Sequence, residues 1–146
     1  MAAILSWCIM MLLSNIPVIQ SLQFVNCTAL KRGYRNTLLD ALDRADKRGL
    51  IYDCSYEQQA LRFLQQRAKF KMNKKRWFKE DLAEAEYERR YDKGVFKFRM
   101  LVKEAFYHWN PLFMQVRKKR VGCNYYYRRE RDEHKVACLF GSRRMK

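Results

Sequence analysis

The sequence predicts a small disulfide-bonded α+β domain of a secreted protein, with helices in its N-terminal part and an antiparallel hairpin at its C-terminus. Three observations predict this class. The chain begins with an uncharged apolar segment, apolar residues then recur at helical spacing between residues 38 and 64, and two strand-like runs end the chain. Helices followed by strands, without regular alternation of the two, are typical of α+β proteins.

The first 21 residues have the features of a signal peptide. Met1 to Ser21 contain no Lys, Arg, Asp or Glu, and their apolar block is too short to span a bilayer. The segment ends with Pro17 a few residues before small Ser21, which suits signal peptidase at the −1 position. We therefore expect a leader at residues 1–21 and a single extracellular domain at residues 22–146. The alternative is a buried N-terminal helix.

Removal of this leader takes Cys8 and leaves four cysteines, Cys27, Cys54, Cys123 and Cys138. An even number of cysteines in an oxidising compartment predicts two disulfides, although four cysteines allow three pairings. We favour a Cys123–Cys138 bridge because two short strand-like runs surround these residues, which leaves Cys27 to pair with Cys54.

Asn26 opens an Asn-Cys-Thr sequon, so the protein is a candidate glycoprotein. An early bridge at Cys27 would block glycosylation there. The sequence has no CxxC pair, and His108 and His134 stand alone, so we expect neither a metal site nor a cofactor.

Two helices are predicted first. Asn36 or Thr37 can cap the first, and Gly49 can end it. The second begins at Ser55, which forms a capping-box pattern with Gln58. Their apolar stripes consist of Leu38, Leu39, Leu42 and Ala45 in the first helix and Ala60, Leu61 and Leu64 in the second.

Residues 67–90 are highly charged and weakly periodic. Leu82, Ala83 and Ala85 among many Glu and Arg residues favour an exposed helix with ion pairs four residues apart. Gly94 ends that helix. The next run, Val95 to Trp109, begins with strand-like alternation but fits a helix equally well, and the period alone leaves both open.

The end of the chain predicts a turn and a hairpin. Asn110-Pro111 marks the turn. The strand-like runs, Val121 to Arg128 and Lys135 to Phe140, are joined by a charged turn at residues 129–133.

Several segments resemble the CAP superfamily of cysteine-rich secretory, antigen-5 and pathogenesis-related-1 proteins, above all its secreted nematode members. The run Gly49 to Ala60 carries an aromatic-Asp-Cys before a helix with Glu and Ala at matching offsets. Arg120 to Cys123 and Val136 to Phe140 resemble the closing pair of disulfide-linked strands, and Phe113-Met114-Gln115 resembles a Phe-Thr-Gln motif. The resemblance implies a secreted α+β domain with a Cys123–Cys138 bridge.

The same comparison implies that the histidine and glutamate set of the CAP cavity is lost. Leu112 stands in place of the histidine before the Phe-Thr-Gln motif, and the first helix contains no histidine. Lys79-Glu80-Asp81 replaces a Gly-Glu-Asn segment, so Glu104 alone can be carried over.

A second resemblance is to small secreted proteins of powdery mildew fungi, which have a ribonuclease-like fold without catalysis. Phe24 to Cys27, a following helix and the late Cys138 are similar in outline. This resemblance implies a Cys27–Cys138 bridge, so the pairing of the cysteines distinguishes the two families.

We expect no enzymatic activity. His108 lies beside Trp109 in an aromatic segment, where we expect a packed or surface residue, and His134 lies in a charged turn, where we expect it to be solvated. The sequence has no Gly-x-Ser-x-Gly motif or Cys/His nucleophile context, and four cysteines in a secreted chain are expected to be oxidised. The expected protein is therefore a monomeric interaction protein without a small-molecule substrate.

The basic surface is the stronger functional observation, since Lys and Arg exceed Asp and Glu by 16 charges. Two clusters are candidates for binding polyanions: Arg67, Lys69, Lys71, Lys74, Lys75, Arg76, Trp77 and Lys79 in the first, and Arg117, Lys118, Lys119 and Arg120 in the second. Cations with interleaved aromatics suit phosphate contacts and base stacking. The alternative is a solvated face that serves solubility.

We therefore expect an effector that acts on a host protein or an anionic host surface, such as a sulfated glycan, an anionic membrane or RNA. A polyanion- or RNA-binding module is the second hypothesis. A third is a peptide precursor, since the basic quartet ending at Arg120 has the form of a processing site that would release residues 121–146.

Overall fold

The computed structural model describes residues 27–45, 49–71, 82–92 and 94–143. The predicted leader and its alternative both lie outside these residues. Within the described residues, no helix combines the length and the apolar character needed to cross a bilayer.

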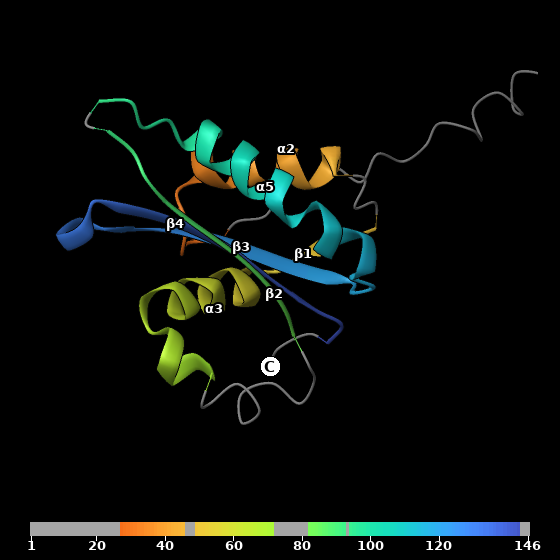
Figure 1. The fold of residues 1–146 in the computed structure, drawn as a ribbon. Coiled ribbons are helices and arrows are strands. Elements are labelled where there is room, and N and C mark those ends of the chain that lie inside the picture. The colour runs from red at the N-terminus through yellow and green to blue at the C-terminus, as the bar shows by residue number, and fades with distance from the viewer. Residues whose placement is uncertain (1–26, 46–48, 72–81, 93, 144–146) are drawn as a thin grey trace, which may run out of the picture.

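A four-stranded sheet forms the middle layer of the fold (Figure 1). Its strands are β1 (Ile51–Tyr52), β2 (Ala83–Arg90), β3 (Arg120–Arg128) and β4 (Glu133–Gly141), in the spatial order β1-β3-β4-β2. The pair β1 and β3 is parallel, and the other pairs are antiparallel. Helices α2 (Arg32–Arg44) and α5 (Phe98–Gln115) cover one face, and α3 (Cys54–Gln65) covers the other (Figure 1).

Strand β4 separates two apolar cores because side chains alternate between the faces of a strand. Val136, Cys138 and Phe140 pack into the core beneath α2 and α5, while Ala137 and Leu139 pack into the core against α3. Since both faces are buried, β4 has a nearly continuous apolar sequence. The predicted α+β class with a terminal hairpin is confirmed. The hairpin strands β3 and β4 are the two central strands of the sheet, and β1 and β2 lie at its edges.

Both early helices begin before the predicted residues. Helix α2 starts at Arg32, so Asn36 and Thr37 lie inside it and cap nothing, and Lys31 occupies the N-cap without a side-chain hydrogen bond. Helix α3 starts at Cys54, and its cap is Asp53, whose carboxylate accepts a hydrogen bond from the Ser55 amide at 2.9 Å. The predicted capping box between Ser55 and Gln58 is therefore wrong.

The helix predicted within residues 67–90 is also wrong. Residues 67–71 are helical, but Ala83–Arg90 form strand β2, which pairs along its whole length with β4. The indole nitrogen of Trp109 donates to the backbone oxygen of Glu86 at 3.1 Å. Pairing with a buried strand outweighs the helical preference of Ala, Glu and Arg at these positions.

The open choice for residues 95–109 is resolved as a helix from Phe98 onward. The predicted turn at Asn110-Pro111 is wrong, because α5 continues through Pro111 to Gln115. Trp109 and Phe113 are buried on either side of this proline and pack in the core beneath the helix. The predicted hairpin is confirmed, with a short 3₁₀ turn and left-handed Asp132 between its strands.

Candidate functional site

Two disulfides cross-link the described part of the chain. The Cys27–Cys54 bridge ties the segment before α2 to the first residue of α3, and the Cys123–Cys138 bridge joins directly opposite residues of β3 and β4. This is the pairing favoured from the sequence. The Cys27–Cys138 bridge implied by the powdery mildew resemblance is not formed, because Cys27 is bonded to Cys54 and Cys138 is bonded to Cys123.

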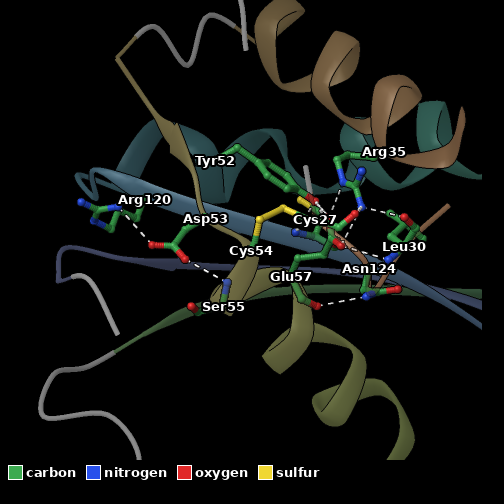
Figure 2. The surroundings of a disulfide bond; sticks show 11 residues. Cys27, Leu30, Arg35, Tyr52, Asp53, Cys54, Ser55, Glu57, Arg120 and Asn124 are labelled. Atoms are coloured by element: carbon green, nitrogen blue, oxygen red, sulfur yellow. Dashed lines mark hydrogen bonds and ion pairs between the residues drawn. A yellow bond between two sulfur atoms is a disulfide. The ribbon is translucent and has the colours of Figure 1, made fainter. Parts of the chain in front are cut away.

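A buried ion pair lies beside the Cys27–Cys54 bridge (Figure 2). The guanidinium of Arg35 on α2 donates to both carboxylate oxygens of Glu57 on α3, from Nε at 2.6 Å and from Nη2 at 2.9 Å. The Tyr52 hydroxyl and the Leu30 amide also donate to this carboxylate, at 2.7 and 2.9 Å. Glu57 is fully buried and Arg35 is 4% exposed, so the pair is closed to solvent.

Hydrogen bonding and burial shift the pKa values of two groups in this cluster, Arg35 and Tyr52. The hydrogen bond to Glu57 raises the pKa of Arg35, and burial together with the Glu57 charge raises the pKa of Tyr52 well above its usual value. Tyr52 therefore keeps its proton, and Arg35 keeps its charge. Through the Glu57 carboxylate, this cluster connects α2, β1 and α3.

The backbone of β3 lies unusually close to α3. A Cβ at Gly122 would overlap the backbone of Tyr56 and Glu57. Next to it, the Asn124 side chain donates to the backbone oxygen of Glu57 at 3.0 Å (Figure 2). This close approach holds Glu57 in position for Arg35.

Glu104, the one residue carried over from the CAP resemblance, lies half-buried on α5. Its carboxylate accepts hydrogen bonds from the hydroxyls of Tyr87 at 3.2 Å and Tyr91 at 2.9 Å, and it pairs with Arg89 at 2.7 Å. Burial raises the pKa of Glu104. The hydrogen bonds from Tyr91, Arg89 and Tyr87 together lower it by more than burial raises it, so the pKa lies below its usual value. Glu104 is therefore ionised and fully engaged at neutral pH.

Glu104 lines an open hollow of about 360 Å³ between β2 and α5. His108 stacks on the ring of Tyr87 in its wall, with ring centroids 5.1 Å apart. In the described ranges, no group of three His, Cys, Asp or Glu side chains is arranged to hold a metal ion.

The second histidine is placed differently from the sequence-based prediction. We expected His134 to be solvated in a charged turn, but it is 7% exposed at the start of β4. It stacks on Phe96 with ring centroids 3.6 Å apart, and its Nδ1 lies 2.7 Å from the Tyr125 hydroxyl. Burial lowers the pKa of His134.

The two predicted cationic clusters lie on different parts of the fold. Arg67, Lys69 and Lys71 are exposed beyond α3, on the α3 side of the sheet, while the Arg117 to Arg120 quartet links α5 to β3 (Figure 1). The structure does not bring these two described sets together. Lys74, Lys75, Arg76, Trp77, Lys79 and the sequon at Asn26 lie outside the described residues.

Two predicted cations already have acidic partners. Arg67 pairs with Glu86 at 3.0 Å, and Arg120 pairs with the α3 cap Asp53 at 3.0 Å. Arg120 also begins β3, where it lies opposite Ile51 and Gly141. Cleavage after Arg120 would therefore cut the chain inside the sheet, which argues against a peptide precursor.

Sequence reasoning missed the exposed face of α5. Met100, Tyr107 and Met114 on this face are 40%, 81% and 80% exposed. Their spacing of seven residues is visible in the sequence, but it could not be assigned to a surface while a strand remained open for this segment.

Comparisons with known proteins agree with this fold. The model of the family described as Ancylostoma-associated secreted protein related matches residues 23–140. A solved structure of the Ancylostoma-secreted protein Ac-ASP-7 matches with a TM-score of 0.51 at 15% sequence identity, covering 83% of this chain and 75% of that chain. A structure of manganese-bound Ac-ASP-7 matches at 14% identity with a TM-score of 0.46, covering 84% and 73% of the two chains. A search of curated protein sequences finds no significant match.

Proposed function

Because the chain belongs to the Ancylostoma-associated secreted protein related family, a divergent nematode-type branch of the CAP superfamily, we propose that it is a secreted interaction protein without catalytic activity. It acts outside its cell of origin, as an effector on a host protein or at an anionic host surface. The leader predicted at residues 1–21 directs its export, and the two disulfides suit an oxidising compartment.

The observation that carries the proposal is the engagement of three buried or half-buried acid–base side chains and of the cysteines. Glu57 is closed in an ion pair, Glu104 accepts from two tyrosines and an arginine, and His134 is stacked and held neutral by burial. The four cysteines described are in disulfides, where they cannot act as nucleophiles.

Charge supports binding as the activity. A net charge of +16 exceeds what solubility requires and attracts anionic partners at long range. Arg117 and Lys119 are exposed in the segment between α5 and β3, where a partner can reach them.

The second candidate is a module that binds polyanions such as heparin or RNA, and the same exposed cations favour it. The two candidates differ in their response to competition. A polyanion binder loses its partner completely when salt or free heparin is added, because screening removes nearly all of its binding energy. An interaction protein with an apolar contact retains part of its binding.

The test is binding of the purified mature chain to animal cells at increasing NaCl, with and without free heparin and RNA. Saturable binding that partly survives both competitors supports the interaction protein. Binding that heparin or RNA abolishes, and that falls on neutralising Lys74, Lys75 and Arg76 together, supports the polyanion module instead. Absence of saturable binding under all conditions would contradict the proposal.

A further inference from the structure

The exposed face of α5 carries a line of apolar side chains. Met100, Tyr107 and Met114 follow one another at intervals of seven residues, close to two helical turns, so they lie on one side of the helix. Three of the six exposed large apolar residues in the described part of the chain are in this line. We call it the α5 ridge.

Tyr107, at the centre of the ridge, lies between two hollows of about 360 Å³ each, and Met100 lines one of them. One hollow lies between α5 and β2, and the other lies between α5 and α2. Lys103 and Tyr107 line both hollows. Because the surface falls away on either side of Tyr107, this 81% exposed side chain projects toward an approaching surface.

The charges around the ridge are nearly all positive. Four cations line the two hollows, namely Arg44, Arg89, Arg99 and Lys103, against a single carboxylate. That carboxylate, Glu104, is already paired with Arg89. A line of apolar side chains flanked by cations is the pattern of a helix that lies flat in the interface of an anionic membrane.

We propose that the α5 ridge docks the protein on an anionic phospholipid surface. Tyr107 and the two methionines enter the boundary between headgroups and acyl chains, where an amphipathic tyrosine is favoured. Arg99, Lys103 and Arg44 contact the lipid phosphates. The inference rests on the proposed function and specifies its partner.

The ridge distinguishes this partner from the other anionic ones. A sulfated glycan or RNA backbone would use the cations but would leave the line of methionine and tyrosine in water. A lipid surface uses both, and it requires no pattern of hydrogen-bonding groups along the ridge, where the chain offers apolar side chains.

The first test measures sedimentation of the full mature chain with phosphatidylcholine vesicles that contain phosphatidylserine, and with vesicles of phosphatidylcholine alone. We expect binding to the anionic vesicles only. Tyr107→Ser combined with Met114→Gln removes two ridge side chains that lie in solvent, so the fold is retained, and we expect partitioning to fall about tenfold. The matched control is Ile51→Ser with Val95→Ser, two apolar side chains that are each 51% exposed elsewhere.

The second test separates the ridge from net charge. Arg99→Gln with Lys103→Gln is expected to weaken vesicle binding about fivefold for each cation removed. Arg129→Gln with Arg131→Gln removes the same charge from the exposed hairpin tip, and we expect this pair to weaken vesicle binding far less than Arg99→Gln with Lys103→Gln does.

The inference is overturned if the wild type does not bind the anionic vesicles, or if the control pairs weaken binding as much as the ridge pairs. Retention of cell binding without vesicle binding would leave the proposed function standing and remove the lipid. If the Tyr107 and Met114 substitutions then abolished cell binding, the ridge would dock a protein instead of a membrane.

Discussion

Replacement of Glu57 tests how strongly the buried ion pair holds the two helical layers together. Glu57→Leu removes a fully buried carboxylate that accepts four hydrogen bonds, and it leaves the Arg35 guanidinium 4% exposed without a counter-charge. Breaking a buried pair from one side costs about 3–5 kcal/mol. Since Arg35 Nη2 still donates to the backbone oxygens of Cys27 and Leu30, we expect a loss near the lower end, about 3 kcal/mol.

The assay is urea unfolding of the oxidised protein at pH 7. The double variant Glu57→Leu with Arg35→Met leaves no buried charge, so we expect it to be more stable than Glu57→Leu alone. Glu88→Gln is the matched control, because its pair with Lys135 is 52% exposed on the Glu88 side and is worth at most about 1 kcal/mol. A loss below about 1 kcal/mol for Glu57→Leu, or a double variant no more stable than Glu57→Leu alone, would contradict the role of the buried pair.

Three further predictions concern stability. Burial lowers the pKa of His134 below its unfolded value of 6.5, so the unfolded chain binds a proton at a higher pH than the folded chain does. The free energy of unfolding measured by urea titration should therefore fall as the pH drops below 6.5, and it should fall less steeply in His134→Phe. Cys123→Ala with Cys138→Ala opens a 15-residue loop and should lower the unfolding free energy by about 3 kcal/mol; an unchanged melting temperature would be inconsistent with the bridge. Gly122→Ala forces a methyl group against the backbone of Tyr56 and should cost about 1–3 kcal/mol in the same titration, whereas exposed Gly33→Ala should not destabilise.

The sequence predicts well those helices and strands in which the spacing of apolar residues follows the buried face of the element. The hairpin strands are apolar on both faces, as in Val136 to Phe140, and Leu38, Leu39 and Leu42 recur along one helical face. The cysteine pairing followed from the hairpin, because opposite residues of two neighbouring strands are close enough to bridge.

Strand β2 was missed because local preference and tertiary pairing disagree. Ala, Glu and Arg favour a helix, yet Ala83, Ala85 and Tyr87 alternate with glutamates at the period of a strand. That alternation was present in the sequence, but only the free edge of β4, which no local pattern reveals, makes the strand the more stable choice.

The candidate site was less predictable than the fold. Arg35, Tyr52 and Glu57 come from three elements, and nothing in their spacing indicates that one carboxylate joins them. His134 looked solvated because its neighbours in sequence are charged, whereas Phe96 and Tyr125 bury it from other elements. Tertiary contacts, which single-sequence patterns do not encode, decide both cases.

A secreted binding protein must be exported and its four described cysteines oxidised, and one measurement tests both together. A non-reduced peptide map by mass spectrometry of the protein recovered from a secreting culture identifies the N-terminus and the cysteine partners. We predict an N-terminus near Leu22 with Cys27–Cys54 and Cys123–Cys138 bridges in an intact chain. Retention of Met1 with four free thiols would contradict a secreted binding protein at its first step.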